Sequence, residues 1–182
     1  MNIKKLDDGS LLALFRSRWA DSIYSSHSTD GGRTWSDPIP TELPNNNSSI
    51  QFAKLNNGHL ALVFNNMNAD NCTERRVSLY DEIEDGEDGE DGEILSNDQG
   101  IPGEENKSGE GRTAFWGALR APMTVAISED GGKTWPYIKD IEVGDGYAMT
   151  NNSKEKLNRE YSYPSIKQSP DGKIHIAFTY FR

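Results

Sequence analysis

The sequence lacks several features that would point to particular classes of protein. A single cysteine, Cys72, excludes a disulfide framework within the chain. No apolar run approaches 18 residues, so no membrane-spanning segment is expected. The opening residues, MNIKKLDDGS, lack the apolar core of a signal peptide, and the compartment, cytoplasmic or secreted, stays undecided. The three histidines, His27, His59 and His175, show no metal-ligand spacing, so we expect neither a metal nor a cofactor.

Patterns typical of nucleotide and nucleic-acid binding are missing as well. No glycine-rich loop follows a strand into a helix, as a phosphate-binding loop would. The basic residues do not concentrate in one stretch with aromatic residues, and we therefore expect no nucleic-acid partner. Convincing helical periodicity is also lacking, which favours an all-β fold.

Acidic charge is present, but almost all of it lies in one segment. Residues 81–110 hold 13 Asp or Glu and one Lys, a net charge of −12 within a chain of −10 overall. The rest of the chain therefore carries a net charge of +2. Such a polar, glycine-rich stretch cannot bury enough apolar surface to order itself, so residues 81–113 are expected to be a disordered acidic insertion.

Three stretches share a hairpin pattern: Ile3–Phe15 (IKKLDDGSLLALF), Ile50–Phe64 (IQFAKLNNGHLALVF) and Ile166–Phe178 (IKQSPDGKIHIAF). Each places Asp-Gly or Asn-Gly between two apolar runs, the strongest short-range hairpin signal, because glycine supplies the positive φ of a tight turn. The second runs, LLALF, LALVF and IHIAF, are apolar at successive positions. We therefore expect these strands to be covered on both faces, as in sheets stacked face to face.

An octad, STDGGRTW at Ser28–Trp35, recurs as SEDGGKTW at Ser128–Trp135. Both octads lie between two strand-like runs, where a hairpin turn is expected. The aspartate can accept backbone N–H groups, the glycines allow left-handed φ, and the tryptophan can cover the hairpin, so a structural role is favoured over a catalytic one. The residues assigned to this role are Ser28, Asp30, Gly32 and Trp35 in the first octad, and Ser128, Asp130, Gly132 and Trp135 in the second.

The spacing of these signals predicts the four-stranded blades of a β-propeller. Blade one would span about residues 3–43, and blade two about residues 49–143 with the acidic insertion inside it. A truncated blade three would span residues 163–182. Since closed propellers generally have four to eight blades, about two and a half blades are expected to belong to a longer propeller.

The octad pattern Ser-x-Asp-x-Gly-x-x-Trp resembles the Asp box, or BNR repeat, of sialidases and sialidase-like propellers. Residues 43–51 (LPNNNSSIQ), 120–135 (RAPMTVAISEDGGKTW) and 159–182 (REYSYPSIKQSPDGKIHIAFTYFR) also resemble this family. The resemblance implies a six- or seven-bladed propeller and an exo-glycosidase that hydrolyses a terminal acidic sugar such as sialic acid. The implied partner is a carbohydrate that carries a carboxylate.

In such sialidases an arginine triad binds the sugar carboxylate, a tyrosine paired with a glutamate is the nucleophile, and an aspartate is the acid/base. Two alternatives stay open on the same scaffold. One is a lyase or hydrolase that acts on uronate or rhamnosyl-glucuronate glycans. The other is a non-catalytic propeller that binds glycans or proteins.

The candidate catalytic residues are Tyr163 and Tyr161, with Glu160 as the group that activates a tyrosine. Arg120 and Arg182 lie at ends of predicted strands and are candidates for binding the substrate carboxylate. The alternatives are a surface position for each arginine and aromatic packing between blades for each tyrosine.

Further candidates for substrate binding are the amides Asn45, Asn46 and Asn47, which also suit a turn, and Arg16 and Arg18 after the first apolar run. Trp19 follows them and could stack on a sugar ring. The FRIP-type first arginine motif of the family is not present, and no acid/base aspartate is distinguished. The chain alone is therefore expected to be inactive.

Overall fold

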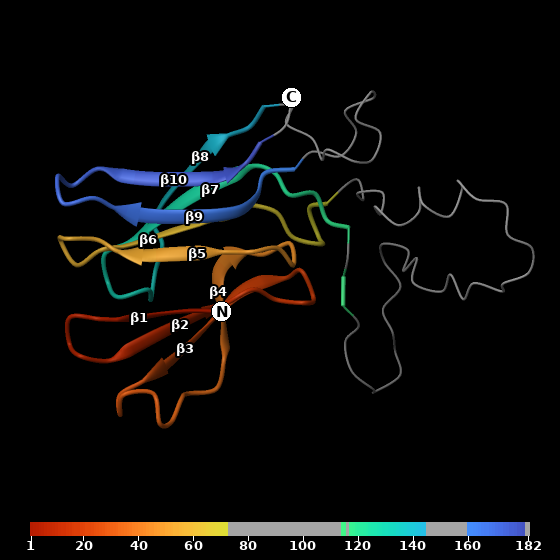
Figure 1. Cartoon of the computed structure of the whole chain (residues 1–182). Helices are drawn as coiled ribbons and strands as arrows, with labels where there is room; N and C mark the ends of the chain where they lie inside the picture. Colours follow the sequence, from red (N-terminus) through yellow and green to blue (C-terminus); the bar gives the residue numbers. More distant parts are fainter. Residues whose placement is uncertain (73–113, 116, 145–159, 181–182) are drawn as a thin grey trace, which may run out of the picture.

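The computed structural model of the protein describes residues 1–72, 114–115, 117–144 and 160–180 (Figure 1). These ranges contain strands, turns and loops but no helix, and hence no helix that could cross a membrane. All strand pairs within the sheets are antiparallel, which confirms the predicted all-β fold. The strands are β1 (Asn2–Lys5), β2 (Leu11–Phe15), β3 (Ser22–Ser28), β4 (Ile39–Pro44), β5 (Gln51–Lys54), β6 (Leu60–Asn65), β7 (Met123–Ser128), β8 (Tyr137–Glu142), β9 (Ser162–Gln168) and β10 (Ile174–Thr179).

The strands form three sheets in which neighbours in sequence are neighbours in space. The first sheet has the order β1-β2-β3-β4, the second β5-β6-β7-β8, and the third pairs β9 with β10. Within the second sheet, β6 pairs directly with β7 from Asn65↔Met123 to Leu60↔Ser128. The acidic stretch at residues 81–113 therefore connects adjacent strands of one sheet, and it lies outside the described residues.

Each sheet begins with the hairpin that the sequence predicts. Gly9, Gly58 and Gly172 have φ of 87°, 86° and 86°, in the left-handed region that favours glycine. The Gly9 N–H donates to Leu6 O at 3.1 Å, and Gly58 makes the same bond to Leu55 O at 3.0 Å. The repeated Asp-Gly and Asn-Gly signals therefore produce the same turn three times.

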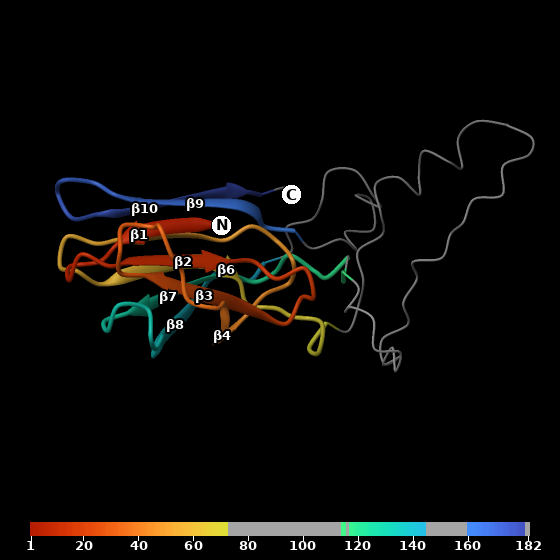
Figure 2. The same cartoon turned by 90° about the horizontal axis from the view of Figure 1, so that it is seen from below.

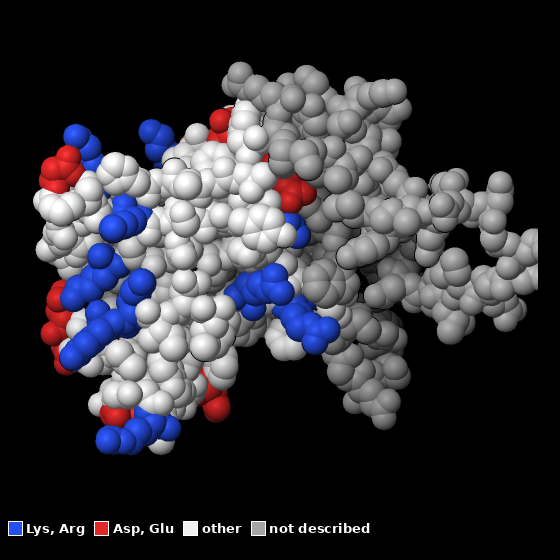
Figure 3. Space-filling model, in the orientation of Figure 1, with Lys and Arg blue, Asp and Glu red and all other residues white. Residues whose placement is uncertain are grey.

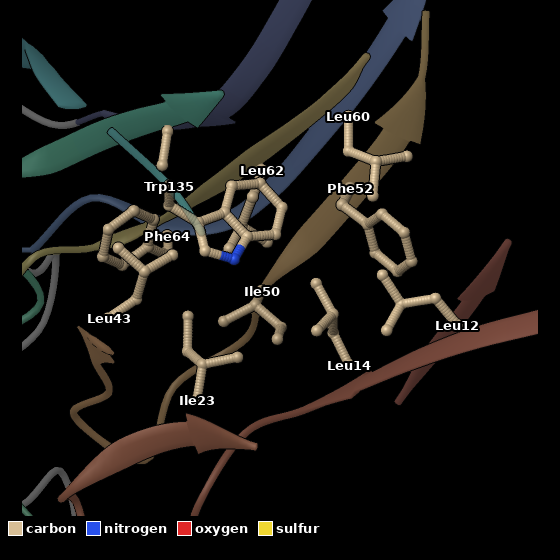
Figure 4. Packing of buried hydrophobic residues seen from close by; sticks show 11 residues of the cluster. Leu12, Leu14, Ile23, Leu43, Ile50, Phe52, Leu60, Leu62, Phe64 and Trp135 are labelled. Carbon is tan, nitrogen blue, oxygen red and sulfur yellow. The ribbon is translucent and has the colours of Figure 1, made fainter. Parts of the chain in front are cut away.

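The second sheet is packed between the other two, and β6 shows why its sequence is apolar throughout. Every residue of β6 is buried. Its alternate residues Leu60, Leu62 and Phe64 join a core with the first sheet (Figure 4). Ala61 and Val63 join a core with the third sheet. Because strand side chains alternate between faces, a strand buried on both sides must be apolar at successive positions.

The strand β10 departs from the expected pattern. The run IHIAF predicts a strand covered on both faces, but His175 and Ala177 are exposed and Ile174 is 41% exposed. Only Ile176 and Phe178 pack against the core that the third sheet shares with the second. The prediction is wrong for β10 because no further sheet lies on its other face among the described residues.

Side chains of the first strands tie successive sheets together. Asn2 Nδ2 of β1 donates to Ile50 O at 2.9 Å, and Ile166 N of β9 donates to Gln51 Oε1 at 2.8 Å. Asn2 and Gln51 occupy equivalent positions, since each opens the first strand of its sheet. The same kind of amide bridge therefore joins the first sheet to the second and the second to the third.

Neighbouring strands alternate in direction within each sheet, so their connections gather at two opposite ends (Figures 1 and 2). We call one the turn end, which carries the three hairpins and, after β3 and β7, the two octads. The other is the loop end, which carries residues 16–21 and 45–50, the segment 117–122 before β7, and residues 160–163 at the start of β9.

Gly132→Ala is expected to destabilise the protein more than Gly32→Ala, although both residues have the same backbone conformation, with φ of 89° and 91°. A Cβ at position 132 would lie 2.6 Å from Leu12 Cδ2 of the first sheet, whereas at position 32 the nearest atom, Leu11 Cδ1, would be 3.4 Å away. Overpacking should add roughly 1–3 kcal/mol to the backbone strain that both variants share. Urea unfolding of the two variants measures this difference, and equal losses would contradict the packing of the second octad on the first sheet.

Candidate functional site

The two octads are closed turns whose polar groups bond to one another. Asp30 Oδ1 accepts from Arg33 N and Thr34 N, both at 2.9 Å, and Asp30 Oδ2 accepts from Thr34 Oγ1 at 2.7 Å. Ser28 Oγ donates to Asp30 Oδ1 and accepts from Gly32 N. The second octad repeats each of these bonds around Asp130 within 0.1 Å. Both carboxylates are thus fully engaged within their own turns.

These bonds hold the pKa of both aspartates well below the ordinary value of 3.8. For Asp30, the backbone N–H and then the hydroxyl of Thr34 lower the pKa to about 2. For Asp130, burial alone would raise the pKa, but the hydroxyl and N–H of Thr134 outweigh it and bring the pKa to about 2. A carboxylate with a lowered pKa stays ionised, so neither group is suited to be a general acid near neutral pH.

The lowered pKa values predict a specific loss of stability in acid. Because Asp30 and Asp130 have folded-state pKa values below the unfolded value, their contribution is complete above about pH 4 and is lost as pH falls through 2. The free energy of unfolding from urea titrations should fall over this range. A double variant, Asp30→Asn with Asp130→Asn, should show a shallower fall, and an unchanged pH slope would contradict the assignment.

The two tryptophans of the octads differ in their surroundings. Trp135 is 1% exposed and lies in the core between the first and second sheets, where Glu42 Oε1 of β4 accepts its backbone N–H at 2.5 Å. Trp35 is 36% exposed, and its indole Nε1 donates to Gly32 O at 3.1 Å. The same turn therefore contributes to the packing between two sheets only in its second copy.

The loop end brings together residues that are far apart in the sequence. Arg120 Nη1 donates to Glu160 Oε1 at 2.8 Å, in an ion pair whose side chains are both largely buried. The Tyr161 N–H donates to Arg120 O at 2.7 Å, so a backbone bond aligns the two segments. Ser162 Oγ also donates to Glu160 Oε1, at 2.8 Å. The Glu160 carboxylate is therefore fixed by a guanidinium and a hydroxyl.

The two candidate tyrosines lie in different environments. Tyr163 is 68% exposed, has a φ of 52°, and lies with its ring 5.6 Å from Arg120 Cζ. A non-glycine residue in the left-handed region is strained, and such strain often occurs at functional sites. Tyr161 is fully buried, with its ring stacked on Tyr180 and edge-on to Phe178. Tyr161 thus packs in the core, and Tyr163 is the tyrosine that a ligand can reach.

The amides of the β4–β5 loop face inward rather than toward solvent. Asn45 Oδ1 accepts from Ser17 N at 2.9 Å and from Asn47 N at 3.1 Å, and Asn46 Nδ2 donates to Leu119 O at 2.7 Å. Asn47 Nδ2 donates to Phe115 O at 3.0 Å, while its buried Oδ1 has no donor among the described residues. These three residues therefore hold the loop end together, and their role in binding a ligand stays a prediction.

Asn65, which sequence reasoning missed, connects three segments of the loop end. This buried residue ends β6, and its Nδ2 donates to Tyr161 O at 3.0 Å and to Pro122 O at 3.2 Å. Its Oδ1 accepts from Ser48 Oγ at 2.8 Å. The available signal was an asparagine directly after the all-buried run LALVF, since a buried amide needs partners.

The cations of the described residues are divided between the two ends. Lys and Arg side chains gather at the turn end and beside the residues drawn in grey (Figure 3). Arg16, Arg18 and Arg120 lie at the loop end, whereas Arg33 and all seven described lysines lie on strands or at the turn end. Arg16 and Arg18 are exposed, and neither forms an ion pair with a described residue. The remaining candidate, Arg182, lies outside the described residues.

The described residues hold no group of three or more His, Cys, Asp or Glu side chains placed to bind a metal ion. The loop end instead combines three arginines with the Glu160 carboxylate and an exposed tyrosine. The guanidinium groups are suited to bind anions, and the tyrosine hydroxyl is suited to bind polar hydroxyls.

Stacked antiparallel sheets with two octad turns place the protein in the class of all-β proteins built from repeated sheets. The family model of the BNR repeat-like domain matches residues 1–176, and the chain belongs to this family. The sequence-based assignment to sialidase-like BNR, or Asp-box, proteins is thereby confirmed. No curated protein matches the chain.

Proposed function

We propose that the loop end binds a terminal sugar that carries a carboxylate, as part of a sialidase-like propeller of six or seven blades. The segregation of Arg16, Arg18 and Arg120 at this end supports the proposal most directly. Arginine binds a carboxylate through two parallel hydrogen bonds, which lysine cannot do, so clustered arginines suit this ligand. Because Glu160 already pairs with Arg120, the carboxylate would be bound chiefly by Arg16 and Arg18.

Hydrolysis of such a sugar is the reaction that we propose. Tyr163 is the candidate nucleophile, because it is exposed beside Arg120 whereas Tyr161 is buried. In this scheme the Tyr163 hydroxyl oxygen forms a bond to the anomeric carbon as the glycosidic bond breaks and the leaving alcohol takes a proton from solvent. A water molecule then cleaves the bond between tyrosine and sugar, giving its hydroxyl to the sugar and a proton to the Tyr163 oxygen. Glu160, held by Arg120 and Ser162, is the candidate base for the hydroxyl proton.

Calorimetric titration of the 182-residue chain tests the binding step. N-acetylneuraminic acid and glucuronic acid should bind, whereas neutral galactose should not. An Arg16→Gln, Arg18→Gln double variant should raise the Kd about tenfold or more, since each lost charge-assisted bond contributes above 1 kcal/mol. The matched control is Lys167→Gln with Lys173→Gln, which changes the net charge equally through two exposed lysines of the third sheet. Equal weakening by both double variants, or no preference for acids, would sink the proposal.

Activity assays on the complete propeller separate the three possible functions at the same site, since the chain alone is expected to be inactive. Release of the fluorophore from a fluorogenic sialoside indicates a hydrolase, and Tyr163→Phe should then abolish the release. Formation of an unsaturated uronate from a uronate-containing glycan indicates a lyase instead. Binding of acidic sugars without either product indicates a non-catalytic glycan-binding protein.

A further inference from the structure

The loop that carries Arg16 and Arg18 is held rigidly by its backbone. Ser17 is buried, its N–H donates to Asn45 Oδ1 at 2.9 Å, and its Oγ accepts from Trp19 N at 3.1 Å. Backbone groups of two further loop residues also bond to other segments. Phe115 N donates to Arg18 O at 2.8 Å, and Ala69 N donates to Ala20 O at 2.7 Å. A loop with this many bonds loses little conformational freedom when a ligand binds.

Three side chains of this rigid loop are nevertheless exposed. Arg16 and Arg18 are exposed cations, and Trp19 between them and β3 is 41% exposed. The Trp19 ring lies edge-on to Tyr24, with ring centroids 6.1 Å apart, and Tyr24 is fixed by a 2.8 Å bond from its hydroxyl to Asp21 Oδ2. The indole is thus supported by an ordered neighbour while much of its surface faces solvent.

We infer that Trp19 is a stacking platform for the ring of the acidic sugar whose carboxylate Arg16 and Arg18 bind, an inference that rests on the proposed function. One face of a pyranose ring is lined by C–H groups, and these pack favourably on the electron-rich face of an indole. Aromatic walls with a few placed polar groups are typical of small-ligand sites. A carboxylated sugar is the ligand that uses both the indole and the guanidinium groups carried by the same loop.

The chain contains a matched comparison for this role. Trp35 is exposed to a similar extent, at 36%, but it lies at the turn end, and its Nε1 donates to Gly32 O within its own turn. Its octad neighbour Arg33 lies two residues before it in the sequence. An exposed tryptophan close to an arginine in the sequence therefore occurs at both ends. Among the described residues, only Trp19 follows two arginines that form no ion pair with an acidic side chain.

The test is a titration of the full chain with N-acetylneuraminic acid, followed by tryptophan fluorescence and by calorimetry. Trp19→Ala should abolish most of the fluorescence change and raise the Kd about tenfold or more, the range found when a central tryptophan contact is truncated. Trp19→Phe keeps an aromatic face and should retain part of the affinity. Trp35→Ala should leave both the Kd and the fluorescence change nearly as they are, and circular dichroism checks that all variants fold.

The outcomes distinguish this inference from the proposed function. If the acid binds the Trp19→Ala variant as tightly as the original chain, the stacking platform is wrong and the acidic-sugar site stands. If binding is weakened equally by Trp19→Ala and Trp35→Ala, the inference is likewise overturned. If the original chain binds no acidic sugar, both the proposed function and the platform fail.

Discussion

Replacing Trp135 by alanine is expected to lower the free energy of unfolding by about 3–5 kcal/mol, the range for truncating a large buried aromatic residue. Its ring fills the space between the first and second sheets, among Ile23, Leu43, Ile50 and Phe64 (Figure 4). Alanine would leave a cavity there, because the hydrogen bonds between neighbouring strands hold both sheets in place and keep them from filling it. Chemical denaturation of the variant measures the loss.

Trp35→Ala provides the control, since it removes the same side chain from the same turn motif. Trp35 is 36% exposed, and its loss should cost only about 1 kcal/mol. A ratio near three or more between the two losses is the expected result. Similar losses would mean that Trp135 does not contribute to packing between sheets and serves only its own turn.

The second large effect is expected for Asn65→Asp, which should destabilise the protein by about 3–5 kcal/mol. The substitution keeps the size of the side chain but replaces an N–H₂ donor by a carboxylate oxygen. That oxygen would face Tyr161 O and Pro122 O, two carbonyl groups that now accept from Asn65 Nδ2. Urea denaturation at neutral pH measures the loss, and binding of acidic sugars should fall with it because the loop end loses its central connection.

Asn57→Asp is the matched control for Asn65→Asp. Asn57 is exposed in the second hairpin, where the equivalent residues of the other two hairpins are Asp8 and Asp171. Its Oδ1 accepts from His59 N at 3.2 Å, a bond that a carboxylate preserves. The expected change is within about 0.5 kcal/mol. A comparable loss at both positions would show that Asn65 is not a structural centre of the loop end.

The elements that depend on nearby residues could be predicted from the sequence. A tight turn favours glycine at a left-handed position, and the short patterns around Gly9, Gly58 and Gly172 predict such turns. The octads also contain all the partners of their aspartates, since Asp30 bonds only within residues 28–34. The apolar run LALVF predicted burial on both faces because the period of a strand is two.

The sequence allowed the residues of the candidate site to be named, but not the contacts between them. Arg120 and Glu160 were each singled out, but their ion pair joins segments forty residues apart, which no local pattern reveals. The same holds for Asn65, whose bond to Tyr161 O spans 96 residues. Burial likewise separates Tyr161 from Tyr163. Positions two apart in a regular strand face the same side, but Tyr161 precedes β9 and Tyr163 has a φ of 52°, and one ring lies in the core while the other is exposed.

The division between a scaffolding turn end and a ligand-binding loop end can be tested most directly by residue-resolved NMR. The chain would be titrated with N-acetylneuraminic acid while backbone and arginine side-chain resonances are followed. We predict shifts at residues 16–19, 45–47, 119–120 and 160–163, with residues 28–35 and 128–135 unchanged. Shifts confined to the two octads, or no shifts at millimolar sugar, would contradict the assignment of the loop end as the binding site.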